Sequence, residues 1–341
     1  MYDDCTTLYF LIIHCQPLTE ERNDMNLSEI EERISIGETL LLDGAVGTQL
    51  QRLHVPMDNT AWAAKALVTH PSTVLQMHRM YIDQGVDIIT TNTYSSARHN
   101  LEPLGLGDQV AELNIRAVHL AIEARDRFAQ KPLAVAGSIS SFGLTVRGES
   151  ERALHRHARG RTEITEHQAI ANLNEQARLL EDTGVDFLIA ECTGSRILRE
   201  RVYEACNETS LPAWLGFRVR WNEEDQCIDT GYSSNDTLDD CLDQLKSSPL
   251  PKGIALFHST IESIDHALPI LTAKFNGTIV VYPEADRADY TARTRDDGEP
   301  ILVTTRDFVD AAKRWKSMGA HVIGGCCGID VDYISAIREA L

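Results

Sequence analysis

The chain has 341 residues, of which 43% are hydrophobic, enough to bury one large core. Its formal net charge of −19 lacks the basic footprint that a nucleic acid or an anionic membrane attracts. No apolar run approaches the ~20 residues that cross a bilayer. These features favour a protein that acts on a small molecule, and a homo-oligomer is compatible with them.

The cysteines and the N-terminus indicate the compartment. Eight cysteines without framework spacing are typical of free thiols in a reducing environment. Asp3 and Asp4 stand where a signal peptide carries positive charge. We therefore predict a cytoplasmic protein. Residues 1–24 show no periodicity and are expected to form a poorly ordered extension, which leaves 25–341 as one folded domain.

From residue 39 onward, short apolar runs alternate with amphipathic helical segments. Strands are expected at 39–42, 87–90, 133–136, 186–190, 213–217, 253–257, 278–282 and 321–323. Eight strand–helix units predict an α/β fold, a single-domain (β/α)₈ TIM barrel. A doubly wound open sheet is the competing architecture, but neither a G-x-G-x-x-G nor a P-loop pattern supports it.

In such a barrel the active site lies at the carboxyl ends of the strands. Six of the expected strands are followed there by polar residues or glycines. These are Asp43-Gly44, Thr91-Asn92, Gly137-Ser138, Glu191, His258-Ser259 and Cys326-Cys327. For the two carboxylates, a role at the catalytic face is favoured over a structural one.

The cysteine pair lies within Gly324-Gly325-Cys326-Cys327-Gly328. Zn²⁺ prefers sulfur, and flanking glycines let the backbone turn sharply enough for both thiols to face one ion. A strained disulfide and two small buried residues are the alternatives. The polar segment 147–161, which contains five arginines and two histidines, is either a solvated loop or a basic lid over an anionic substrate group.

The order of several motifs is similar to that of a known family. Asp43-Gly44-Ala45-Val46-Gly47-Thr48, Trp62, Pro71, His78, Tyr81, Thr91-Asn92-Thr93-Tyr94, Gly137-Ser138, Glu191 and the final Gly-Gly-Cys-Cys-Gly resemble the homocysteine S-methyltransferases. That family includes betaine- and S-methylmethionine-dependent enzymes and the homocysteine domain of cobalamin-dependent methionine synthase. The resemblance implies a (β/α)₈ barrel with a Zn²⁺ that activates the homocysteine sulfur. It also implies that Asp43 and Glu191 hold the amino group, while Gly44, Asn92, Gly137 and Ser138 shape the pocket.

The third metal ligand departs from the family pattern. The family uses a cysteine after the sixth strand, but segment 253–260 contains none. His258 takes that place in one register and Ser259 in the next. We favour His258 because imidazole is a common zinc ligand. A histidine that only forms hydrogen bonds in a site without metal, and Cys192 as a substitute ligand, are the other readings.

This exchange changes the charge of the predicted site. Three thiolates around Zn²⁺ give −1, whereas two thiolates and a neutral imidazole give zero, which leaves a bound thiolate less nucleophilic. Two further departures, Cys192 for a threonine and Glu284 for an asparagine, lie in substrate-facing segments and leave the methyl donor open.

The predicted function is a zinc-dependent S-methyltransferase that moves a methyl group from a sulfonium or other onium donor to the thiol of homocysteine or a similar amino acid. Cys326, Cys327 and His258 are its predicted metal ligands. The alternatives are a metal-dependent demethylase or lyase of a sulfonium compound on the same scaffold, and an amino-acid-binding homologue without catalysis.

Overall fold

A computed structural model of the chain describes residues 24–147, 163–231, 236–245, 250–285 and 303–341. The expected N-terminal extension, except Asp24, and the Arg- and His-rich segment, except Arg147, lie outside the described residues. Asp24 forms an isolated parallel bridge with Leu133, so the described fold begins at that residue.

Eight parallel strands form the centre of the molecule. They are β1 (Leu40–Leu41), β2 (Ile88–Thr90), β3 (Ala134–Ser140), β4 (Phe187–Cys192), β5 (Ala213–Phe217), β8 (Gly253–Phe257), β9 (Thr278–Tyr282) and β10 (Val322–Ile323). They pair in the order β1-β10-β9-β8-β5-β4-β3-β2. A parallel bridge between Leu42 and Ile88 joins the two outer members of this order. The predicted (β/α)₈ barrel is confirmed.

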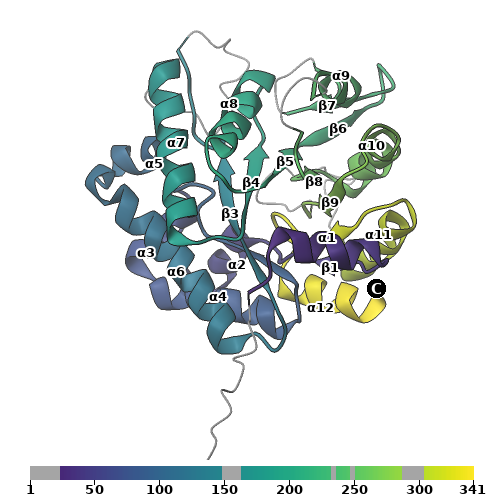
Figure 1. Ribbon diagram of the computed structural model, residues 1–341, viewed down its shortest axis with the longest axis horizontal. Coiled ribbons are helices and arrows are strands. Elements are labelled where there is room, and N and C mark those ends of the chain that lie inside the picture. Colours follow the sequence, from purple (N-terminus) through teal and green to yellow (C-terminus); the bar gives the residue numbers. More distant parts are fainter. Residues whose placement is uncertain (1–23, 148–162, 232–235, 246–249, 286–302) are drawn as a thin grey trace, which may run out of the picture.

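Helices surround this barrel (Figure 1). They are α1 (Leu27–Ser35), α2 (Val46–Arg52), α3 (Ala66–Thr69), α4 (Pro71–Asp83), α5 (Arg98–Leu101), α6 (Val110–Phe128), α7 (Glu166–Thr183), α8 (Arg196–Asn207), α9 (Leu238–Gln244), α10 (Ile261–Lys274), α11 (Thr305–Ser317) and α12 (Val331–Ala340). None of the helices in the described ranges is long and apolar enough to cross a bilayer.

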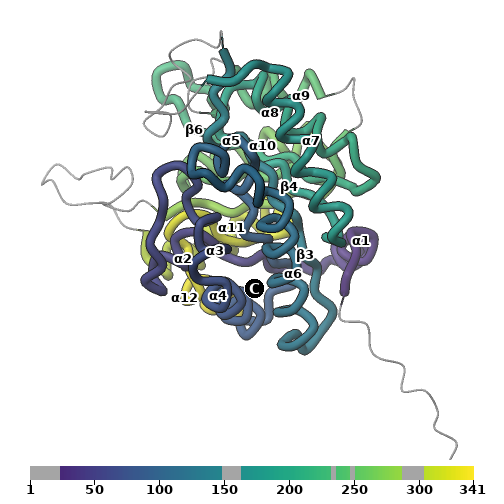
Figure 2. Tube along the Cα trace, turned by 90° about the vertical axis from the view of Figure 1, so that its left-hand side faces the viewer, coloured from purple at the N-terminus to yellow at the C-terminus, as the bar shows by residue number. Residues whose placement is uncertain are grey.

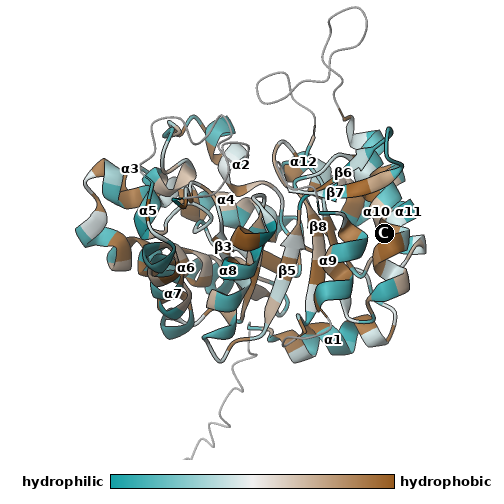
Figure 3. Ribbon diagram, turned by 90° about the horizontal axis from the view of Figure 1, so that it is seen from above, coloured by the Kyte–Doolittle hydropathy of each residue, from teal (hydrophilic) through white to brown (hydrophobic). Residues whose placement is uncertain are grey.

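The pleat of the strands divides the apolar side chains between two cores. Leu40 and Leu42 face the barrel interior, whereas Leu41 between them joins the layer under the helices. Met25 and Ile30 bury their side chains in the interior core, so α1 plugs one end of the barrel. Figures 2 and 3 show α1 at one end and α2, which follows β1, at the other. The open end therefore lies at the carboxyl ends of the strands.

Two strands are longer than the sequence predicts. β3 continues to Ser140 and β4 to Cys192, so Gly137, Ser138 and Glu191 lie within strands and not after them. The ladder continues because Ser140 pairs with Glu191, whose side chain faces the polar mouth of the barrel. Polarity therefore marks the point where the interior becomes a pocket, not the end of the strand.

An antiparallel hairpin after β5 was not predicted. It consists of β6 (Val219–Asn222) and β7 (Cys227–Thr230). Each strand has four residues and buries residues on one face only. Its sequence is therefore less apolar than those of the barrel strands, which are buried on both faces. The hairpin lies at the open end of the barrel (Figure 3).

Asp186, at the plugged end, should make stability depend on pH. Its carboxylate accepts a hydrogen bond of 2.7 Å from Val135 N, and burial raises its pKa to about 6. The fold favours the neutral form, so its stabilising contribution is full below about pH 4 and is lost as the pH rises through 6. We compare the unfolding free energy of Asp186→Asn with that of the unmodified protein. The difference should shift in favour of the variant by roughly 1–1.5 kcal/mol from pH 5 to pH 8. Urea unfolding of both proteins at the two pH values measures this shift. A difference in unfolding free energy that is the same at pH 5 and pH 8 contradicts the prediction.

Candidate metal centre and substrate pocket

The turn that carries the cysteine pair is packed too closely for side chains at its two leading glycines. A Cβ atom at Gly324 would lie 2.6 Å from Leu42 Cβ, and one at Gly325 would lie 2.2 Å from Ile329 Cγ2. Gly325 N donates to Asp43 O over 3.0 Å, which fastens the turn after β10 to the turn after β1. The glycines thus let the backbone place both thiols at the barrel mouth.

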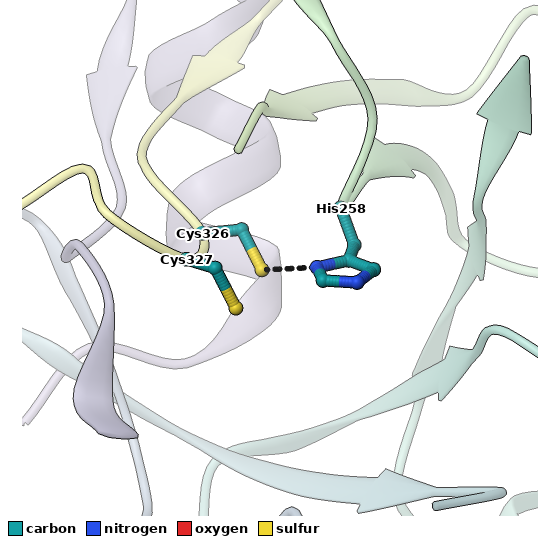
Figure 4. A group of neighbouring side chains, drawn as sticks. All are labelled: His258, Cys326 and Cys327. Atoms are coloured by element: carbon teal, nitrogen blue, oxygen red, sulfur yellow. Dashed lines mark hydrogen bonds between the residues drawn. The ribbon is translucent and has the colours of Figure 1, made fainter. Parts of the chain in front are cut away.

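His258 follows β8 directly and faces this pair. Its φ of +45° is a left-handed conformation that non-glycine residues rarely adopt and that recurs at functional sites. Its Nδ1 lies 3.6 Å from Cys326 Sγ (Figure 4). Potential ligand atoms of His258, Cys326 and Cys327 all lie within 4.8 Å of one another. Zinc bonds of about 2.0 Å to nitrogen and 2.3 Å to sulfur require a similar spacing, so the three residues fit a tetrahedral ion with one open position.

The two other candidates for the third ligand are engaged elsewhere. Ser259 Oγ donates to Phe257 O over 2.6 Å and accepts from Val219 N over 2.8 Å, so this hydroxyl anchors the β6–β7 hairpin. Cys192 Sγ is buried 4.0 Å from Arg199 O, on the side of β4 that faces α8. The structure therefore brings His258, and neither Ser259 nor Cys192, to the cysteine pair.

The two thiols differ in acidity. A hydrogen bond from Cys326, together with nearby His258, lowers the pKa of Cys327 well below its usual range. The same hydrogen bond and burial raise the pKa of Cys326. The pair therefore favours one thiolate, which is the form that binds metal.

Two buried carboxylates lie in the same cavity. Asp43 accepts from Thr90 N over 2.8 Å and from the Thr90 hydroxyl. Glu191 accepts from the Ser138 hydroxyl and, over 3.1 Å, from the Tyr282 hydroxyl. Among the described residues, neither carboxylate has a lysine or arginine partner.

This lack of a cation leaves both carboxylates with a strong preference for a positive ligand. Burial raises the pKa of Asp43 well above its usual value, and Glu191 raises it further. Burial raises the pKa of Glu191 to about 7, although the Ser138 and Tyr282 hydroxyls lower it in part. A ligand ammonium group between them would stabilise both in their charged form.

These groups line a cavity of about 180 Å³ at the barrel mouth. Gly44, Asn92 and Ser138 also line it, and Asn92 Nδ2 donates to Ala63 O over 3.0 Å. Gly137 does not, because its missing Cβ would point at Leu188 and away from the cavity. A role of Gly137 in shaping the pocket therefore stays a prediction, through the backbone that carries Ser138.

Aromatic side chains also line this cavity, among them Trp62, Tyr94 and Phe142. The rings of Tyr94 and Phe142 lie 5.4 Å apart. A Cβ atom at Gly47 would lie 2.1 Å from Trp62 Nε1, so only glycine lets the indole occupy this place. Aromatic faces attract cations as well as apolar groups.

Sequence reasoning assigned no role to Thr90 and Tyr282, and it placed Glu284 only in a substrate-facing segment. Thr90 holds Asp43, Tyr282 holds Glu191, and Glu284 Oε2 lies 3.1 Å from His258 Nδ1. Thr90 and Tyr282 are the last residues of β2 and β9, so the same attention to strand ends would have found them.

Comparisons with known proteins identify the family of the chain. Residues 40–341 match the homocysteine S-methyltransferase family. A selenocysteine methyltransferase from Astragalus bisulcatus is 26% identical, with 89% of this chain and 93% of that protein covered. Homocysteine S-methyltransferase 2 from Zea mays is 27% identical, with 89% and 90% covered.

A solved structure has the same fold. The metallated form of the homocysteine methyltransferase MmuM from Escherichia coli gives a TM-score of 0.70 at 23% identity, with 91% of this chain and 99% of that chain covered. The match of the family over nearly the whole barrel confirms the resemblance that the motifs indicate. The chain belongs to the homocysteine S-methyltransferase family.

Proposed function

We propose that the protein is a zinc-dependent S-methyltransferase that moves a methyl group from a sulfonium or other onium donor to the thiol of homocysteine or a related amino acid. The main observation is that one cavity combines three possible metal-ligand side chains, two carboxylates that have no lysine or arginine partner among the described residues, and several aromatic side chains. The relatives named as selenocysteine methyltransferases add a selenol as a candidate acceptor.

Cys326, Cys327 and His258 would hold the ion and leave one position for the acceptor sulfur. The ion would supply Lewis acidity that lowers the pKa of a coordinated thiol, so the acceptor would be a thiolate at neutral pH. The metallated form of MmuM supports a metal in this fold, and the two thiols with one imidazole support zinc in particular.

Asp43 and Glu191 bind the amino group of the acceptor. Their buried oxygens are fixed by Thr90, Ser138 and Tyr282, so they need little rearrangement when the ligand binds. The ammonium ion offsets the burial cost of both charges, which gives specificity for an α-amino acid.

The transfer is a direct displacement. The acceptor thiol loses its proton to solvent, its sulfur forms a bond to the methyl carbon, and the bond from that carbon to the onium centre breaks. The bonding electrons stay with the leaving group, whose former onium atom becomes uncharged. The donor approaches in line with the acceptor sulfur, within the part of the cavity that Trp62, Tyr94 and Phe142 line.

Trp62→Leu should weaken the binding of the donor more than the binding of the acceptor. The substitution keeps apolar volume but removes the ring face, which is worth about 0.5–2 kcal/mol to a cation. We expect the donor KM to rise by roughly 3–30-fold while the acceptor KM changes little. Steady-state kinetics with each substrate varied in turn measure this, and equal effects on both constants count against an aromatic donor site.

A matrix of donors and acceptors tests the proposed function. Zinc-loaded protein is incubated with S-methylmethionine, S-adenosylmethionine or betaine, each with and without homocysteine or selenocysteine, and the products are identified by mass spectrometry. The proposal predicts methylated acceptor with at least one onium donor. Donor turnover without any thiol favours the sulfonium demethylase or lyase, and no turnover together with tight amino-acid binding favours a non-catalytic homologue.

A cytoplasmic location is part of this proposal. All six cysteines of the described residues are free thiols, which supports a reducing compartment. A metal centre with two thiolates also depends on such conditions.

A further inference from the structure

Trp62 enters the cavity from a backbone conformation that suits glycine. Its φ of +42° and ψ of −121° are close to those of the second residue of a type II′ turn, a place that glycine dominates. The turn is closed by Ala64 N, which donates to Ala61 O over 2.8 Å. For a bulky side chain this conformation is an outlier, and it persists only where the surrounding contacts over-determine it.

Two buried side chains from the segment after β2 hold the carbonyl groups on either side of Trp62. Ser95 Oγ donates to Ala61 O over 2.7 Å, and Asn92 Nδ2 donates to Ala63 O over 3.0 Å. Ser95 and Asn92 are only 2% and 3% exposed, so water cannot readily replace these bonds. Both carbonyl groups that flank the strained residue are therefore fixed by this segment.

The place of the indole in the cavity depends on the same conformation. The ring has room only because Gly47 lacks a Cβ atom, which would lie 2.1 Å from Trp62 Nε1. Trp62 O also accepts from Asp58 N over 3.2 Å, which ties the turn to the chain before it. A relaxation of Trp62 to a negative φ would rotate its Cα–Cβ bond and carry the ring away from Gly47. The hydrogen bonds of the turn thus decide where the ring lies.

We propose that Ser95 and Asn92 are positioning residues that keep Trp62 in its positive-φ conformation and so hold the indole where the methyl donor binds. This inference rests on the proposed function for the identity of the donor. Asn92 then shapes the pocket through Trp62, because its amide nitrogen is engaged by the turn. Recognition of the donor depends on a serine hydroxyl that points at the backbone and not at the donor.

Fluorescence quenching of Trp62 in the free protein tests the positioning directly. The chain has four tryptophans, and subtracting the emission of the matching Trp62→Leu protein isolates that of Trp62. Ser95→Ala removes the hydroxyl that holds Ala61 O, so the turn should relax. The emission of Trp62 should move to longer wavelength, and acrylamide should quench it more strongly. An emission and a quenching constant equal to those of the unmodified protein overturn the proposal.

A double-mutant cycle on the donor KM tests the consequence for substrate binding. With S-methylmethionine and homocysteine, Ser95→Ala should raise the donor KM by roughly 3–10-fold, the size of one hydrogen bond, and leave the acceptor KM unchanged. In the Trp62→Leu protein the same substitution should have no further effect, because no indole is left to position. A rise that persists in that background means that Ser95 contacts the donor or supports the pocket in general, and it overturns the proposal.

Ser263→Ala is the matched control. Ser263 is 1% exposed, and its hydroxyl accepts from Trp221 N over 3.1 Å, away from the residues that line the cavity. This variant should leave the Trp62 emission and the donor KM unchanged, and changes as large as those of Ser95→Ala contradict a specific role. Ser95→Cys keeps the shape and a weak donor, so it should lie between serine and alanine. It takes the place of Ser95→Ala in both experiments if the alanine variant does not fold.

The two readouts separate this proposal from the proposed function. Quenching requires neither metal nor substrates, so it decides whether Ser95 positions Trp62 even in a protein that transfers no methyl group. Conversely, a methyltransferase whose Trp62 emission does not respond to Ser95→Ala contradicts the positioning and leaves the proposed function in place.

Discussion

Cys326→Ala is expected to abolish metal binding and methyl transfer together while the barrel stays folded. Cys326 lies on a turn at the barrel mouth, where alanine keeps the Cβ atom and removes only the sulfur. Partners outside the coordination shell are worth 10–100-fold in metal affinity, so we expect a loss of at least about 100-fold for a direct ligand. Elemental analysis after gel filtration and a methyl-transfer assay measure the two losses.

Cys227→Ala is the matched control for this variant. Cys227 lies half-buried in the β6–β7 hairpin and belongs to no metal-ligand group among the described residues. The Cys227→Ala variant should retain zinc and activity. That result would show that the loss of a thiol outside the candidate metal site is harmless. Full activity in Cys326→Ala would sink the proposed mechanism, whatever its zinc content.

Asp43→Asn is expected to raise the acceptor KM by roughly 10²–10³-fold. The amide keeps the shape and still accepts from Thr90 N, but it removes one of the two charges that we propose bind the amino group. Truncating one partner of a buried charge pair costs about 2–5 kcal/mol, in part because the other charge is left unpaired. Steady-state kinetics with homocysteine measure the change.

A thiol acid that lacks the α-amino group separates recognition from structure. Its turnover should be slow in the unmodified protein and change little in Asp43→Asn, because it has no ammonium ion to lose. A variant that loses activity equally on both thiols indicates that Asp43 supports the fold of the pocket, and contradicts a role in binding the amino group.

The barrel could be predicted because its strands are buried on both faces. Runs such as Thr278–Tyr282 and Gly253–Phe257 are almost continuously apolar and lie where they were expected. The β6–β7 hairpin was not predicted because Val219–Asn222 buries one face only. The ends of β3 and β4 were placed too early because the barrel interior becomes polar at the pocket while the backbone ladder continues.

The site was predictable in its composition but not in its contacts. The rule for strand ends identified Asp43, Glu191 and the cysteine pair. The sequence favoured His258 over Ser259 on ligand chemistry alone, because a shift of one residue decides which side chain faces the mouth. The left-handed backbone of His258 makes that choice, and only the fold brings Glu284 next to it.

The central claim is that Cys326, Cys327 and His258 together bind one zinc ion. Zinc K-edge X-ray absorption on stoichiometrically loaded protein without substrate tests it most directly. We predict two sulfur ligands at about 2.3 Å and at least one imidazole nitrogen at about 2.0 Å, with the nitrogen signal lost in His258→Ala. Protein that binds no stoichiometric zinc, or a first shell unchanged in His258→Ala, would contradict the account.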